Sequence, residues 1–141
     1  MNKLNGIIAN IQQAGSIMLV DIKVNSHLFS AMLIASDEEN SWLKTGNRVD
    51  VVFKETEVSL AKGLSGQICL RNRMLCTVKD VTKGELLSKV TMDFMEYTIV
   101  SVITTRSVEA LTIQPSDEVE AMVKANEVTL MRTTNLNAKT Q

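Results

Sequence analysis

The 141-residue chain has few of the residues on which disulfide-rich, metal-binding or catalytic proteins depend. It contains two cysteines, one histidine and one proline. Two cysteines cannot form a disulfide scaffold, and with a single histidine no zinc site of the usual spacing can be assembled. We therefore expect Cys69 and Cys76 to be free thiols in a reducing compartment.

Aromatic side chains and an excess of positive charge are also missing. Aromatic residues make up 4% of the chain, and 15 basic side chains nearly balance 16 acidic ones. Proteins that bind nucleic acid usually combine a basic groove with stacking aromatics, so this composition argues against that class even for a small barrel. A site for a small anion is still compatible with it, because backbone N–H groups and one or two local cations can hold a dianion.

Signals for catalysis, secretion and membrane insertion are absent as well. The sequence shows no activated nucleophile, no glycine-rich phosphate loop and no pair of groups placed for acid–base catalysis, so we expect a binding protein and not an enzyme. It opens without a signal peptide, and no apolar run approaches the ~20 residues of a membrane span. These features predict a cytoplasmic protein without a membrane or nucleic-acid partner.

What the chain does contain is an internal repeat. Residues 49–60 align with residues 119–130 at an offset of 70, with Val, Lys, Glu, Val and Leu recurring identically. Gly15 aligns with Gly84 at an offset of 69, which predicts that the early strands of the two copies differ by one residue. Two copies of one unit are therefore expected.

Within each copy the apolar residues alternate with polar ones, as in half-buried strands. Each copy also has one short helical candidate. In the first copy, residues 36–39 form a capping box for a helix that continues through Trp42 and ends at Gly46. In the second, residues 105–107 open a turn or two that Pro115 stops.

About five short strands and one brief helix in some 65 residues describe a small OB-like barrel. The predicted fold class is all-β with one short helix per repeat, in two tandem OB-like small β-barrels. The first barrel is expected at residues 1–62, a linker at 63–66, the second barrel at 67–132 and a disordered tail at 133–141. Units this small bury little core, so pairing or oligomerisation is expected.

Three segments of the second copy resemble the Mop, or molbindin, domain, a TOBE-type molybdate-binding family. They are residues 70–78, Lys83-Gly84 and residues 124–128. The family pattern opens with Ser-Ala-Arg-Asn, has a glycine after the first hairpin strand and ends in Lys-Ala-Ser/Thr/Pro-x-Val. The chain departs from it at four positions, two of them at the opening Ser-Ala, namely Cys69, Leu70, Cys76 and Ser116.

The resemblance covers nearly the whole chain, as in the two-domain members of the family. It implies cytoplasmic binding and storage, or homeostasis, of molybdate or tungstate, with the metal held as an oxyanion and without an organic cofactor. It also implies a homo-oligomer, a trimer of two-domain chains, with anion sites at interfaces between barrels. The alternative is a molybdate-sensing regulatory module that acts through a partner protein.

The resemblance and the chemistry of a tetrahedral dianion, which needs converging donors and one or two cations, select the candidate ligands. They are Cys69, Arg71, Asn72, Thr104, Lys124, Ala125 and Asn126 in the second copy, and Lys54, Glu55 and Thr56 in the first.

Each candidate also has a purely structural interpretation. Arg71 could be a salt-bridged strand arginine, and Lys54 and Lys124 could be solvated. Asn126 and Thr56 have the residue types of hairpin turns, and Thr104 that of a helix cap. Acidic residues 37–39 stand at the first helix start, where they would repel a dianion. We therefore hypothesise that the copies are not equivalent and that anion binding depends on the second.

Overall fold

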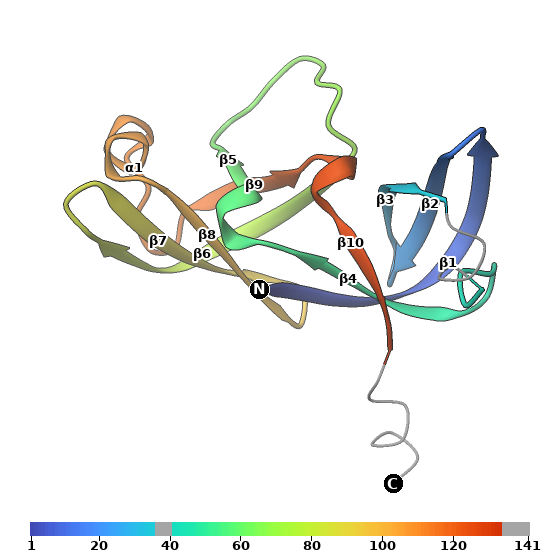
Figure 1. Cartoon of the computed structure of the whole chain (residues 1–141). Coiled ribbons are helices and arrows are strands. Elements are labelled where there is room, and N and C mark those ends of the chain that lie inside the picture. The colour runs from blue at the N-terminus through green and yellow to red at the C-terminus, as the bar shows by residue number, and fades with distance from the viewer. Residues whose placement is uncertain (36–40, 134–141) are drawn as a thin grey trace, which may run out of the picture. The chain divides into compact units, whose positions relative to one another are not determined.

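The computed structural model describes residues 1–35 and 41–133 of the chain. Its elements are β1 (Asn2–Ala14), β2 (Ile17–Val24), β3 (His27–Ile34), β4 (Arg48–Phe53), η1 (Glu55–Glu57), β5 (Ser59–Ala61), β6 (Asn72–Lys83), β7 (Leu87–Phe94), β8 (Tyr97–Thr104), α1 (Thr105–Leu111), β9 (Glu118–Val123), η2 (Ala125–Glu127) and β10 (Thr129–Arg132) (Figure 1). Here η marks a single turn of 3₁₀-helix.

The chain forms two compact units. Unit 1 consists of Met1–Asn2 and Phe53–Glu127, and unit 2 consists of Lys3–Val52 and the chain from Val128 onward. Each unit contains one five-stranded antiparallel sheet. The described part of the chain is therefore mostly β with one short α-helix, and the predicted tandem β fold is confirmed.

In unit 1 the strand order is β5-β9-β6-β7-β8, and α1 contacts β7 and β8. The two edge strands, β5 and β8, also contact each other, so the sheet curls toward closure as in a small barrel. Its concave side holds alternate residues of neighbouring strands that are fully buried, including Met74, Val90, Met92 and Ile99. The period-two pattern of the sequence produces this one-sided core.

In unit 2 the strand order is β10-β4-β1-β2-β3, and the edge strands β10 and β3 again contact each other. The core has the same character, with Leu4, Val20, Ile22 and Phe29 removed from solvent. Each unit therefore carries the same architecture, as a repeated sequence predicts.

The sequence copies and the compact units differ at one short strand each. Strand β5 belongs to the first copy but pairs with β9 of the second, Leu60 lying opposite Ala121. Strand β10 belongs to the second copy but pairs with β4 of the first, Leu130 lying opposite Val51. The boundaries 1–62 and 67–132 follow the sequence repeat and stay a prediction, whereas the compact units exchange these terminal strands.

The same β-bulge interrupts the first hairpin of both copies. The register shifts between Ile8 and Asn10 in one and between Val78 and Asp80 in the other. A tight turn is hydrogen-bonded to each bulge. The Gly46 N–H donates to the Ile8 carbonyl at 2.8 Å, and the Ser116 N–H donates to the Val78 carbonyl at 2.8 Å. The two bulges and the two turns correspond at an offset of 70.

The predicted one-residue difference between the early strands is wrong. Ile8 pairs with Ile22 and Val78 pairs with Met92, so the offset stays at 70 on both sides of the hairpin turn. Gly15 and Gly84 occupy different places in their turns. A glycine match in a turn is weak support for an alignment because several turn positions accept glycine.

The second predicted helix is present as α1, and its own residue Val108 is fully buried. The first lies partly outside the described residues, since its capping box falls on residues 36–39; residues 41–47 form turns without helix. None of the helices in the described ranges has the length and apolar character needed to cross a membrane.

Candidate functional site

Arg71 and Lys124 stand at the same end of the unit 1 sheet. Asn72, the first residue of β6, pairs with Val123, the last residue of β9, so Arg71 and Lys124 are the next residues in this antiparallel register. Both side chains are exposed, and neither has a hydrogen bond or ion pair within residues 1–35 and 41–133. Like charges that face each other across strands repel, and a bound anion would relieve that repulsion.

Backbone donors adjoin this pair of cations. Lys124 precedes the η2 turn, and its carbonyl accepts a hydrogen bond from the Glu127 N–H at 2.9 Å. The first N–H groups of a helical turn have no partner within the turn, which applies here to Ala125 and Asn126. The small Ala125 side chain and the exposed Asn126 amide complete a surface with the donors that an oxyanion requires.

Asn72 holds the two strand ends that carry Arg71 and Lys124. Its side chain is fully buried, and its Nδ2 donates to the Val123 carbonyl at 3.0 Å. This bond ties the first residue of β6 to the last residue of β9. It therefore fixes the two backbone ends from which Arg71 and Lys124 project.

The neighbouring arginine is already neutralised. Nε and Nη2 of Arg73 donate to the Glu120 carboxylate at 2.6 and 2.8 Å, which raises the pKa of Arg73 and lowers that of Glu120. Arg73 also lines a shallow depression with residues 66–69, so exposed Cys69 lies beside it. The sequence analysis did not identify this ion pair, although the strand register brings its two residues together diagonally.

Thr104 lies far from the cation pair. It is the N-cap of α1, its Oγ1 accepting from the Ser107 N–H at 3.1 Å and donating to Ser107 Oγ at 2.8 Å. It pairs with Leu87 at the opposite end of the sheet. The 12-residue strand β6 separates the two ends by on the order of 30 Å. Within unit 1, Thr104 therefore does not join Arg71.

The first-copy candidates lie in unit 1 as well, but with a different charge. Lys54 precedes η1 in extended conformation, and exposed Thr56 lies within that turn. Glu55 occupies the position of Ala125, and its Oε2 lies 3.3 Å from the amino group of Met1, the counterpart of Arg71. A carboxylate thus stands where the second copy has a methyl group.

The last residues of the two 3₁₀ turns, Glu57 and Glu127, interact through their carboxyl groups. A hydrogen bond available to the protonated form raises the pKa of Glu57, with further contributions from burial and from the Glu127 charge. Lys54 acts in the opposite direction. Such a bond requires a proton on one of the two carboxyls, so the interaction is sensitive to pH.

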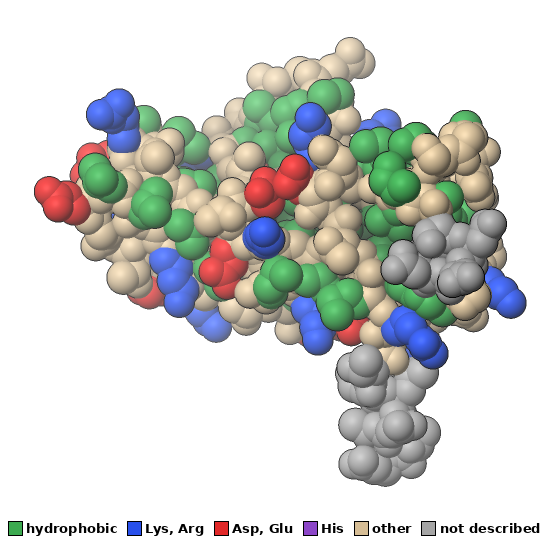
Figure 2. Space-filling view, in the orientation of Figure 1, with side chains coloured by type: hydrophobic (Ala, Val, Ile, Leu, Met, Phe, Trp, Pro, Cys, Tyr) green, Lys and Arg blue, Asp and Glu red, His purple; other side chains and the backbone are tan. Residues whose placement is uncertain are grey.

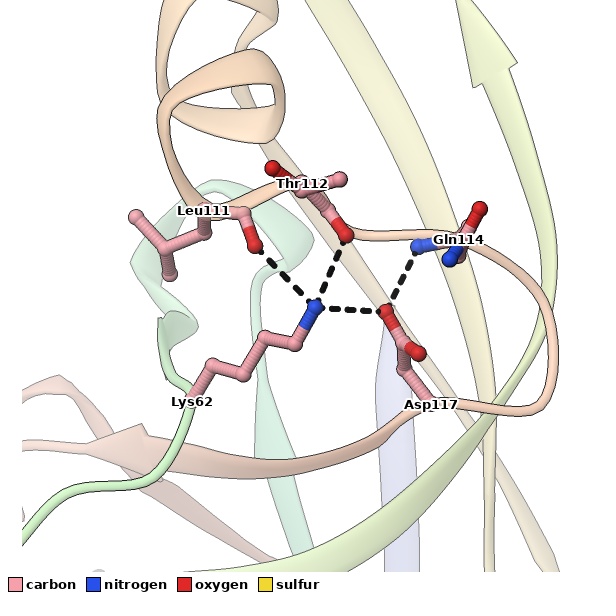
Figure 3. Close-up of polar contacts among 5 residues, drawn as sticks. All are labelled: Lys62, Leu111, Thr112, Gln114 and Asp117. Atoms are coloured by element: carbon pink, nitrogen blue, oxygen red, sulfur yellow. Dashed lines mark hydrogen bonds and ion pairs between the residues drawn. The ribbon is translucent and has the colours of Figure 1, made fainter.

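A second cation, Lys62, has its hydrogen-bond acceptors within the chain, near the end of α1 (Figure 3). Lys62 Nζ donates to the carbonyls of Leu111 and Thr112 at 3.2 and 2.8 Å and to Asp117 Oδ2 at 2.9 Å. Asp117 also accepts from the Gln114 N–H at 2.9 Å, and these bonds lower its pKa. We call this group the lysine cage.

The cation pair is the site that the sequence prediction selects, and no metal site competes with it in the described residues. Among residues 1–35 and 41–133, no three His, Cys, Asp or Glu side chains are grouped so as to hold a metal ion. On the face shown in Figure 2, basic and acidic side chains are interspersed. The cation pair of Arg71 and Lys124 is therefore our candidate site.

Comparison with known proteins gives two kinds of match. Residues 70–130 match the TOBE domain. Among solved structures, the chain is similar to the cytoplasmic molybdate-binding protein ModG with molybdate bound, at 25% identity, covering 94% of this chain and 96% of that one with a TM-score of 0.88. It is also similar to a molybdate-binding protein from Sporomusa ovata, at 40% identity, covering 43% of this chain and 90% of that one with a TM-score of 0.42.

A search of curated proteins gives no match. The resemblance seen in the sequence is nevertheless confirmed, since both the TOBE domain and the two-domain arrangement are found. The prediction of a binding protein and not an enzyme agrees with what ModG is described to do.

Proposed function

We propose that this chain, whose residues 70–130 match the TOBE domain, binds molybdate, or the chemically similar tungstate, in the cytoplasm. The observation that carries the proposal is the unneutralised pair of Arg71 and Lys124 beside the first N–H groups of η2. The likeness to molybdate-bound ModG over nearly the whole chain supports the same ligand.

The geometry suggests how such an anion is held. Arg71 offers a planar fork of donors and Lys124 a compact charge, so two cations meet the two negative charges of the oxyanion. The N–H groups of Ala125 and Asn126 contribute neutral donors. Arg73 stays bound to Glu120, and the buried Asn72 amide keeps the two strand ends in register.

We further propose that the protein stores molybdate as a homo-oligomer, a trimer of two-domain chains. A tetrahedral anion takes donors from all sides, whereas the cation pair lies on the exposed end of a sheet. A second copy could supply Cys69, Thr104 or the remaining candidates to the open side. A partner protein whose association depends on molybdate would instead indicate the sensing role.

The test is a calorimetric titration with molybdate, with sulfate as the control anion. We expect saturable molybdate binding by the wild type and little sulfate binding. Arg71→Ala or Lys124→Ala should weaken it about 10- to 100-fold, the effect of losing a hydrogen bond to a charged group. Lys54→Ala is the matched control and should cost much less, because Glu55 already provides an anion there.

Absence of molybdate binding by the wild type would refute the proposal. Equal losses for Lys54→Ala and Lys124→Ala would refute the non-equivalence of the two copies.

A further inference from the structure

A small pocket in unit 2 contains two arginines and the single tryptophan of the chain. Its lining residues are Trp42, Gly46, Asn47, Arg48, Arg132 and Thr133. Both arginines are exposed, and Trp42 is half-buried. The pocket is formed where β4 begins and β10 ends.

The repeat shows what this pocket corresponds to in unit 1. Thr129 pairs with Val52 as Ser59 pairs with Met122, so Arg132 is the counterpart of Lys62. The Asn47 N–H donates to the Lys44 carbonyl as the Asp117 N–H donates to that of Gln114, so Asn47 is the counterpart of Asp117. The pocket therefore occupies the position of the lysine cage.

The interactions that neutralise the cage are missing from the pocket. Asn47 has no charge, and its Nδ2 donates to the Trp42 carbonyl at 2.8 Å, the counterpart of the Thr112 carbonyl that Lys62 uses. Arg132 has no hydrogen bond or ion pair among the residues that the structure describes. Its counterpart Lys62 has three acceptors.

A second substitution adds positive charge. Arg48 stands where unit 1 has Glu118, and within the described ranges its one hydrogen bond runs from Nη1 to Asn5 Oδ1, at 3.3 Å. Lys62, Asp117 and Glu118 together carry one positive and two negative charges, whereas Arg132, Asn47 and Arg48 carry two positive charges and no negative one. The nearby Asp50 carboxylate is buried, lies 3.9 Å from Lys3 Nζ and is hydrogen-bonded by Asn5 and Thr133.

We propose that this pocket binds a phosphate group, either inorganic phosphate or a phosphate monoester. The phosphate takes the place of the carboxylate that Asp117 provides in unit 1 and that Asn47 lacks in unit 2. Two guanidinium groups suit a dianion with several oxygens, since each can form two parallel hydrogen bonds. The site is distinct from the cation pair of Arg71 and Lys124, because it is built only from unit 2 residues.

Trp42 makes the proposal directly measurable, because its fluorescence is the only indole signal of the chain. The purified full chain is titrated with inorganic phosphate at constant ionic strength, with chloride as the control anion, and phosphate binding is followed in parallel by equilibrium dialysis. We expect a saturable change in Trp42 emission and one phosphate bound per chain. Glycerol 2-phosphate tests whether a monoester binds as well as the free anion.

The decisive variant is Asn47→Asp. It gives the unit 2 pocket the carboxylate that Asp117 provides in the lysine cage, and it keeps both arginines. It should weaken phosphate binding at least tenfold, and Arg132→Gln should do the same by removing a cation. Asp117→Asn in unit 1 is the matched control and should leave phosphate binding unchanged. Thermal unfolding establishes that each variant is folded.

Either of two results would overturn the proposal: no phosphate binding by the wild type, or Asn47→Asp binding as tightly as the wild type. The variant Arg71→Ala/Lys124→Ala separates this site from the proposed molybdate site, since it should lose molybdate and keep phosphate. Phosphate lost from that variant but retained by Asn47→Asp would place the phosphate at the molybdate site and refute the pocket.

Discussion

The two cysteine side chains differ in environment and should differ in reactivity. Cys76 is buried, its Sγ lies 3.5 Å from the Met74 carbonyl, and burial raises its pKa to about 12. Because the thiolate is the reactive species, Cys76 should not react in the native protein. We expect a thiol reagent at pH 8 to label one cysteine per native chain, two after denaturation and none in native Cys69→Ser. Rapid labelling of both native thiols would contradict this.

Ser116 has a backbone φ of +80°, in the region that favours glycine, and its counterpart Gly46 has a φ of +94°. Ser116→Gly should therefore stabilise the protein by about 1 kcal/mol, and Gly46→Ser should destabilise it by a similar amount. Urea unfolding of both variants measures the difference. A loss of stability in Ser116→Gly would show that the serine side chain contributes more than its backbone strain costs.

At the residue scale, the sequence predicts Arg71 and Lys124 as ligands because each lies in a motif with a stated chemical use. It did not identify the partners of Arg73 and Lys62. Glu120 reaches Arg73 only through the strand register, and two of the three acceptors of Lys62 are backbone carbonyls, which carry no residue signature.

At the scale of elements, the contact between η1 and η2 should depend on pH. The pKa of Glu57 is raised in the folded protein, so its contribution to stability is fully present at low pH and is lost as pH rises through that value. Glu57→Gln keeps a donor toward Glu127 at every pH. We expect it to raise the unfolding temperature at pH 8 and to have little effect at pH 4. An equal effect at both values would exclude carboxyl titration as the cause.

The lysine cage should have the opposite dependence on pH. The pKa of Asp117 is lowered, so its stabilising contribution is present at neutral pH and is lost as pH falls through the folded value. Lys62→Met should lower the unfolding temperature by a few degrees at pH 7, and the deficit should shrink in acid. Arg132→Met is the matched control in unit 2 and should have a smaller effect, since Arg132 has no carboxylate partner among the described residues.

The strands themselves were predictable, because alternation of apolar and polar residues reports which side of a sheet is buried. The exchange of β5 and β10 was not. Both strands present a leucine at the same place, Leu60 opposite Ala121 and Leu130 opposite Val51. A repeated sequence therefore fits either pairing equally well, and the local pattern cannot choose between them.

At the scale of the whole molecule, the exchanged strands should hold a cut chain together. Proteolytic cleavage in the segment 63–66, where Gly63 and Gly66 have positive φ, interrupts neither sheet. We expect the two fragments to stay associated in size-exclusion chromatography and to separate only in denaturant. Separation under native conditions would contradict the strand pairing of β5 with β9 and of β10 with β4.

The pairing of β10 with β4 also has a consequence for the time course of synthesis. Val52 and its partner Thr129 lie roughly 80 residues apart in the sequence. At a synthesis rate of about 5 to 20 residues per second, β10 is therefore made some 4 to 16 s after β4. Until then the unpaired edge of β4 can attract other strands. A chain that ends prematurely keeps that edge open permanently, so an interrupted translation product should be recognised by its tendency to aggregate.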